Sequence, residues 1–375
     1  MKYRKMSIEP ADINTAIVLT GGGAKGAYQV GVIKQLLKMG VNFDMVTGTS
    51  IGALNAALLS EFVQKGLSPA QIAAQLESAW LSFQNFMTLN WSGFLKNIFT
   101  LSNISSIYTN KYIKKALCQY IPTQRSFSDY TKCQLSITGT NLSRKELQIF
   151  DFNSTIPVVD AVLASMAYPV AFPAVNIEGE IVIDGGALSN APLKEAIQWG
   201  ARNIYLVFLR PLSIIKEFDI SNIILDGMKV DIRNLNTPAD IVDEGNTMLE
   251  KKGIFNDHTS KSKKKNYSAL EVIDEFLDMA VNRLMYGDLK HAEKTNQLID
   301  LINKYQHMLP SGFIRELRHL FGLKYKGGKR VIKVTRIAPI KVLKPPGLRG
   351  FNQQKAIRDI MQQGEEDTRK AIRQL

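Results

Sequence analysis

Residues 46–59 constrain the fold of this chain more than any other stretch. Their sequence, VTGTSIGALNAALL, places Ser50 between Gly48 and Gly52. The residues before the serine predict a short strand, and the Ala- and Leu-rich residues after it predict a helix. A strand that turns directly into a helix at a Gly-x-Ser-x-Gly pattern pushes the serine outward at the end of a sheet. Ser50 is therefore either a nucleophile or a small residue in a tight turn.

The first 210 residues alternate between strand and helix patterns. Strands are predicted over residues 15–20, 43–48, 134–141, 147–152, 180–183 and 203–209. Helices are predicted over residues 27–39, 51–63, 69–82, 111–120, 156–167 and 192–200. Strands that alternate with helices indicate an α/β fold with a mainly parallel central sheet. We expect a three-layer α/β/α core over residues 15–210, preceded by an N-terminal extension over residues 1–14.

The chain after residue 210 is less regular. Residues 211–266 show no clear period and end near a lysine-rich run at 261–265, so we expect an irregular insertion with freedom to move. Helix patterns return over 267–305, a strand pattern over 331–342, and an amphipathic helix over 353–375 that is interrupted near Gly364. We expect residues 267–375 to add helices to the same domain.

Composition narrows the class of protein. The chain has 375 residues and a net charge of +13, which indicates an anionic partner, either phospholipid headgroups or nucleic acid. Its two cysteines supply neither a disulfide framework nor a four-ligand zinc site. No window of 18 apolar residues and no secretory signal is visible, so we expect a cytoplasmic protein without a transmembrane helix.

A glycine loop lies between the first predicted strand and helix. Its sequence over residues 21–26 is Gly-Gly-Gly-Ala-Lys-Gly, which matches the G-x-G-x-x-G pattern of dinucleotide-binding loops. Such a site also needs an acidic residue at the end of the second strand, whereas Asp44 lies at the start of its strand. The loop alone leaves a nucleotide-binding protein open as an alternative.

A nucleophilic serine requires a base. The four histidines all lie in the last third of the chain, away from any motif of catalytic type: His258, His291, His307 and His319. Asp184 is the better candidate, because it ends a predicted strand and is followed by Gly185 and Gly186. The reference pKa of an aspartate is about 3.9, so work as a base requires a partly desolvated site that raises it.

These motifs, in this order, resemble the patatin-like phospholipase family of lipid acyl hydrolases. The resemblance includes the glycine loop, Gly-Thr-Ser-Ile-Gly, the Ala-Ser-Met-Ala-Tyr-Pro stretch at 164–169 and Asp-Gly-Gly at 184–186, and it covers about residues 15–209. It implies the patatin-like α/β/α fold and a Ser50–Asp184 dyad. Ser50 would attack an ester carbonyl, Asp184 would accept its proton, and water would hydrolyse the acyl-enzyme.

The resemblance also implies the roles of neighbouring residues. The backbone amides of Gly22, Gly23 and Ala24, together with that of Ile51, would form an oxyanion hole. The remaining motif residues would support the site: Gly21, Lys25, Gly26, Gly48, Gly52, Gly185 and Gly186. Lys25 would either support the loop with its charge or be solvated.

The implied substrate is a membrane phospholipid or another acyl lipid, cleaved as a phospholipase A, with no metal and no cofactor. A lysophospholipid, a triacylglycerol or a thioester would be an alternative substrate of the same dyad, and a catalytically silent binding module is a further alternative. We expect peripheral association with an anionic membrane and no nucleic-acid partner. The aromatic-rich residues 86–108 would form either a membrane-dipping lid or a helix and loop packed on the core.

Overall fold

The computed structural model describes residues 13–83, 110–169, 172–212, 332–344 and 353–373, with Lys304 and Gly312 as single residues. Its strands join into one sheet in the order β5-β6-β3-β2-β1-β7-β8, with β4 also paired to β3. Strands β1, β2, β3, β7 and β8 run parallel, whereas the pairings of β4, β5 and β6 are antiparallel. The strand bounds are β1 Thr15–Leu19, β2 Met45–Thr49, β3 Gln134–Asn141, β4 Glu146–Phe150, β5 Val175–Ile177, β6 Glu180–Asp184, β7 Asn203–Val207 and β8 Lys333–Ile337.

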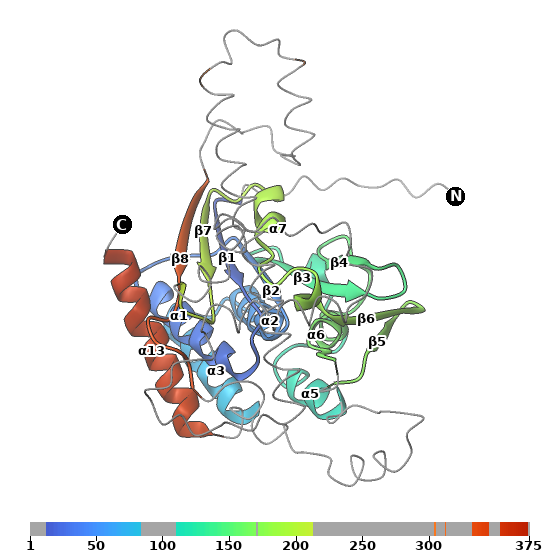
Figure 1. Cartoon of the computed structure of the whole chain (residues 1–375), viewed down its shortest axis with the longest axis horizontal. Coiled ribbons are helices and arrows are strands. Elements are labelled where there is room, and N and C mark those ends of the chain that lie inside the picture. The colour runs from blue at the N-terminus through green and yellow to red at the C-terminus, as the bar shows by residue number, and fades with distance from the viewer. Residues whose placement is uncertain are drawn as a thin grey trace, which may run out of the picture.

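Helices cover both faces of this sheet (Figure 1). Successive residues of a strand point to opposite faces, and β1 therefore contributes to two cores. Ile17 and Leu19 pack with α1, α2, α3, α5, α6 and α13, whereas Ala16 and Val18 pack with α7. The predicted three-layer α/β/α fold class is thus confirmed. The helix bounds are α1 Ala27–Lys38, α2 Ile51–Gln64, α3 Pro69–Phe83, α5 Asn110–Leu117, α6 Val158–Ser165, α7 Leu193–Gln198 and α13 Gln354–Arg373.

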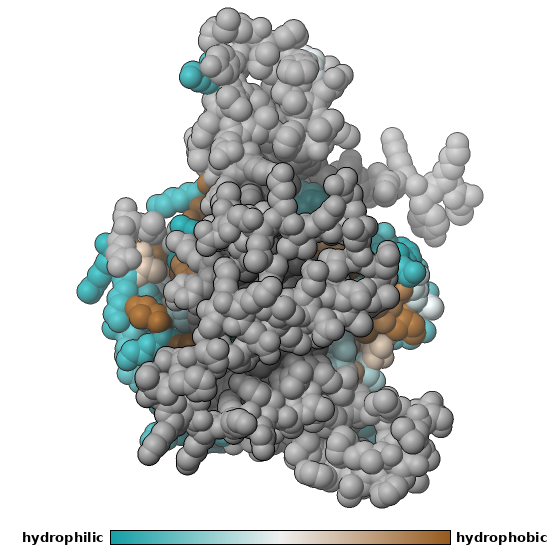
Figure 2. Space-filling view, viewed as in Figure 1, coloured by the Kyte–Doolittle hydropathy of each residue, from teal (hydrophilic) through white to brown (hydrophobic). Residues whose placement is uncertain are grey.

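The amphipathic helix α13 lies against α1. A Cβ atom on Gly364 would lie 2.3 Å from the carbonyl oxygen of Tyr28, so the two helices touch through their backbones. Because Gly364 is needed for this contact and the helix continues through it, the predicted interruption near Gly364 is wrong. The outer edge of the molecule at α13 is mainly hydrophilic in Figure 2. The exposed side chains there are Gln354, Lys355, Arg358, Asp359, Gln362, Glu366, Arg369, Lys370 and Arg373.

Two strands differ most from the sequence prediction. The predicted strand over residues 331–342 is shorter in the structure, because β8 ends at Ile337. β5 has three residues and is too short to show an alternating pattern. Several expectations lie outside the described residues: residues 1–12 of the N-terminal extension, the aromatic residues 86–108, the insertion from residue 213, the four histidines, and the helices over 267–305 apart from Lys304.

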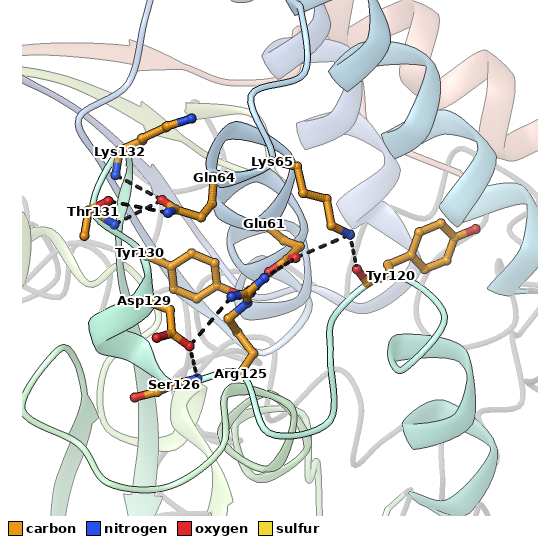
Figure 3. Close-up of polar contacts among 10 residues, drawn as sticks. All are labelled: Glu61, Gln64, Lys65, Tyr120, Arg125, Ser126, Asp129, Tyr130, Thr131 and Lys132. Carbon is orange, nitrogen blue, oxygen red and sulfur yellow. Dashed lines mark hydrogen bonds and ion pairs between the residues drawn. The ribbon is translucent and has the colours of Figure 1, made fainter.

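The C-terminal end of α2 is fixed by a buried ionic network around Glu61 (Figure 3). Arg125 donates from Nε to Glu61 Oε2 at 2.9 Å and from a terminal guanidinium nitrogen to Oε1 at 3.0 Å. Tyr130 donates to Oε2 at 3.1 Å, and Lys65 Nζ lies 3.3 Å from Oε1. A buried carboxylate needs such partners because burial removes its water. The network ties α2 to the residues that lead into β3.

Candidate active site

Ser50 lies in a strained turn between β2 and α2. Its backbone dihedrals are φ 56° and ψ −124°, a combination that residues with a side chain rarely adopt. A Cβ atom on Gly48 would lie 2.3 Å from the carbonyl oxygen of Gly52, and one on Gly52 would lie 2.2 Å from that of Leu19. The residues two before and two after the serine therefore approach each other closely. Glycine alone fits both positions.

The register of the sheet brings Ser50 and Asp184 together. The β3 residue Thr138 pairs with Thr49, and the next residue, Gly139, pairs with Asp184. At Thr138 and at Gly139, β4 pairs with the opposite edge of β3. β2 and β6 therefore lie along the same edge of β3, and their C-terminal ends meet there. Ser50 follows the last residue of β2 directly. Residues 134 positions apart in the chain thus become neighbours at one point of the sheet.

The environment of Asp184 makes its carboxylate more basic than an exposed one. The side chain is buried, and desolvation raises its pKa to about 6. The Ser50 hydroxyl and the backbone amide of Gly186 act in the opposite direction, and the amide donates to Oδ1 at 2.7 Å. No hydrogen bond of ordinary geometry reaches Oδ2 within the described part of the chain. The Ser50 contact is therefore long or poorly aligned, as is common at sites without substrate.

The glycine loop borders Ser50. A Cβ atom on Gly21 would lie 3.0 Å from Ser50 Cβ, and one on Gly26 would lie 2.5 Å from Ile51 Cγ1. Gly22 and Gly23 have φ angles of 156° and 59°, and the short helix η1 (Gly23–Gly26) follows. Both ends of the loop therefore approach the start of α2, whose N-terminal amides favour negative charge.

Of the other residues of the loop, Ala24 and Lys25 are buried. The interpretation of Lys25 as a solvated side chain is therefore wrong. Gly185 and Gly186 are buried and begin the short helix η4 (Gly185–Ala187), which directly follows Asp184.

Polar side chains hold the loop in place. Asn190 accepts from the backbone amide of Gly21 at 3.0 Å, and Gln29 donates to the carbonyl of Thr20 at 2.6 Å. Asn55 donates to the carbonyl of Gly26 at 3.0 Å. The roles of these three side chains were not predicted from the sequence. For Gln29 and Asn55 a signal existed, since both are polar residues on the buried face of a predicted helix.

A dinucleotide site would require an acidic residue at the end of the second strand. Asp44 lies at the start of that strand instead, where it has a structural role. Its Oδ2 accepts from the backbone amides of Asn14 and Thr15, at 3.0 Å and 2.9 Å. The carboxylate therefore anchors the start of β1. No group of three or more His, Cys, Asp or Glu side chains in the described ranges is placed to hold a metal ion. No helix within those ranges is long and apolar enough to cross a membrane.

About half of this chain is similar to known proteins. Residues 17–197 match the family described as patatin-like phospholipase. Patatin-like phospholipase domain-containing protein 7 of Mus musculus is 26% identical over 194 residues, which are 51% of this chain and 13% of that protein. Lysophospholipase NTE1 of Mycosarcoma maydis is 25% identical over 208 residues, which are 55% of this chain and 10% of that protein.

A third relative is closer to this chain in length. The cGAMP-activated phospholipase of Escherichia coli is 27% identical over 197 residues, 46% of this chain and 52% of that protein. Among solved structures, VipD from Legionella pneumophila has a TM-score of 0.39 and 15% identity over 97% of this chain and 67% of its own. The chain thus spans between 10% and 52% of the three sequence relatives.

Proposed function

Because residues 17–197 match the patatin-like phospholipase family, we propose that this chain is a phospholipase A that uses Ser50 and Asp184 as a catalytic dyad. Ser50 attacks the ester carbonyl of a phospholipid and transfers its proton to Asp184. The lysolipid leaves as an alcohol after taking that proton. Asp184 then activates water, which hydrolyses the acyl-enzyme and releases a fatty acid.

The observation that carries this proposal is the strained Ser50 beside a buried carboxyl with a pKa of about 6. An aspartate with its ordinary pKa is too weak a base to accept a proton from a serine near neutral pH. Burial raises the basicity of Asp184 while leaving it ionised at pH 7. The strain fits a serine whose position matters for chemistry rather than for the turn alone.

The oxyanion in this proposal forms between the glycine loop and the start of α2. The amides of Gly22, Gly23, Ala24 and Ile51 are the proposed donors, because both segments adjoin Ser50. The three glycines then serve the close approach of backbone to the developing charge. The proposed site needs no metal and no cofactor.

The proposed substrate lies in a membrane, and the net charge of +13 favours an anionic surface. We include peripheral membrane association in the proposal for this reason. A lysophospholipid is the second candidate substrate, because a relative of this chain carries the name lysophospholipase. Vesicles of phosphatidylcholine with and without an anionic phospholipid, and micelles of lysophosphatidylcholine, distinguish these substrates.

The test combines labelling by a fluorophosphonate, read by intact mass, with release of fatty acid from those vesicles. We expect one label on the wild-type chain and none on Ser50→Ala, together with loss of fatty-acid release. Asp184→Asn is expected to label and hydrolyse about 10²- to 10⁴-fold more slowly, as is typical when a catalytic base is lost. The exposed Ser128→Ala variant is the matched control and should behave as wild type. Labelling and release that persist in Ser50→Ala would exclude this dyad.

A further inference from the structure

The last residue of α6, Ser165, and the residue two positions after it, Ala167, contact the backbones of Ser50 and Asp184. Both belong to the 164–169 stretch, which has no role in the proposed reaction. We propose that Ser165 is a positioning residue, which holds the strained backbone of Ser50 in register with Asp184. The inference rests on the proposed function of the dyad. It concerns how the dyad is assembled rather than which bonds it breaks.

The first contact is made by the Ser165 hydroxyl. Its oxygen accepts a hydrogen bond from the backbone amide of Ser50 at 2.8 Å and donates one to the carbonyl of Thr138 at 2.7 Å. Ser165 is completely buried, so water does not take either role. One hydroxyl can donate once and accept once in this way. It therefore joins the strained turn to the β3 residue that pairs with the end of β2.

The second contact comes two residues later. The backbone amide of Asp184 donates to the carbonyl of Ala167 at 3.0 Å. The three residues from Ser165 to Ala167 therefore contact the backbone of the nucleophile and the backbone of the base. Thr138 also limits the turn after Asp184, since a Cβ atom on Gly185 would lie 2.4 Å from the Thr138 carbonyl oxygen.

These contacts matter because the conformation of Ser50 is unfavourable by itself. The residue lies outside β2 and before the first turn of α2, so neither element dictates its φ of 56°. A bond to its amide restricts rotation of the peptide that carries the Ser50 side chain. Without that bond the hydroxyl could turn away from Asp184, and a displacement of about 1 Å can slow a reaction about 10²-fold.

The experiment measures fluorophosphonate labelling of the full chain in solution, with rate and final extent recorded separately. The extent counts folded sites, whereas the rate reports the geometry of Ser50 in each of them. We expect Ser165→Ala to label about 10- to 100-fold more slowly, with kcat for a soluble ester reduced in parallel. Ser165→Thr keeps the hydroxyl and should recover most of the rate. Ser165→Cys, of nearly the same size but with a weakly accepting sulfur, should remain at least about tenfold slow.

Ser136→Ala is the matched control. It removes another fully buried serine hydroxyl from the same region, on β3, where the oxygen has no hydrogen-bond partner in the described structure. It should label at the wild-type rate. If Ser165→Ala does not fold, Ser165→Cys decides the question.

Four results would overturn the inference. A Ser165 variant that labels at the wild-type rate but to a reduced extent would show a role in stability alone. An equal loss of rate in Ser136→Ala would show a general effect of repacking. Wild-type protein that does not label at Ser50 would refute the proposed function and the positioning role together. Normal labelling of the wild type with an unchanged rate in Ser165→Ala would refute only the positioning role.

Discussion

At the scale of single residues, the titration of Asp184 sets the expected pH dependence of the reaction. Burial raises its pKa to about 6, and the base must be ionised to accept a proton from Ser50. We therefore expect kcat/KM for a soluble ester to be constant above about pH 7 and to fall tenfold per pH unit well below pH 6. A pH profile of the wild-type chain measures this. An unchanged rate down to pH 4.5 would mean that Asp184 keeps an ordinary pKa or is not the base.

The same titration affects stability with a defined sign. A carboxyl whose pKa is higher in the folded state favours folding below pH 3.8, and this advantage is lost as the pH rises to about 6. Asp184→Asn removes the titration, so its stability relative to wild type should increase over this range. The shift corresponds to about 3 kcal/mol as an upper value. Urea denaturation of both proteins at pH 4 and pH 7.5 checks the sign, and parallel pH dependences would contradict it.

The sequence predicted single residues unevenly. It singled out Ser50 and Asp184 because each follows a strand and adjoins glycines, which is a local pattern. The roles of Ser165 and Asn190 depend on which distant backbone group each side chain meets, Ser50 in one case and Gly21 in the other. The contacting residues are 115 and 169 positions apart in the chain, and contacts at such separations produce no periodic pattern in the sequence. Lys25 was ambiguous for the same reason, since its burial depends on the packing of the whole loop.

At the scale of elements, the network at the end of α2 contributes to stability without taking part in the chemistry. Arg125→Met would leave Glu61, which is completely buried, with fewer partners. We expect a loss of about 3 kcal/mol of unfolding free energy, because a buried charge without its partner is costly. Converting Glu61 to leucine in the same chain should recover part of this loss. Chemical denaturation measures both values.

Arg144→Met is the matched control for this network. Arg144 forms ion pairs with Glu146 and Glu180, but its side chain is 47% exposed, against 23% for Arg125. Its loss should cost less than about 1 kcal/mol. The labelling rate of Ser50 should not change in either variant, because Glu61 lies about 16 Å along α2 from the serine. Equal losses of stability would show that the burial of Glu61 is unimportant.

Most helices and strands were predictable because the apolar residues in each recur with the period of a helix or of a strand. The ranges of β3 and α2 agree with prediction to within one residue, since their apolar patterns are long and their ends are marked by polar residues or glycine. β5 was missed because three residues show no period. The pairing of β6 with β3, which brings its end close to the end of β2, could not be predicted from the sequence either, because strand order depends on tertiary contacts.

At the scale of the whole molecule, three described elements lie entirely outside the residues that match the family: β7, β8 and α13. β8 pairs with β7 in parallel, and α13 packs on α1, which directly follows the glycine loop. Asp367 of α13 is buried and accepts from the Tyr28 hydroxyl at 3.4 Å and from the amide of Ile340 at 3.1 Å. These contacts support the hypothesis that the end of the chain packs on the same domain as the family-matched residues.

Gly364→Ala tests this hypothesis, because two effects predict opposite signs. In an isolated helix, replacing glycine by alanine should stabilise by about 1 kcal/mol. In the protein, the new Cβ would lie 2.3 Å from the Tyr28 carbonyl oxygen, a contact with backbone that neither helix can relieve without moving. Such overpacking costs about 1–3 kcal/mol. We therefore expect Gly364→Ala to lower the unfolding free energy of the full chain but to increase the helicity of a peptide of residues 353–375.

The exposed Gln362→Ala on the same helix is the control, and its effect should be small in the protein. Urea denaturation followed by circular dichroism and by tryptophan fluorescence, to which the buried Trp80 of α3 contributes, provides two probes of unfolding. Coincident transitions shifted by Gly364→Ala would mean that α13 and the family-matched residues unfold as one cooperative unit. A shift in circular dichroism alone would mean that α13 melts separately, and the family-matched residues would then be stable without it.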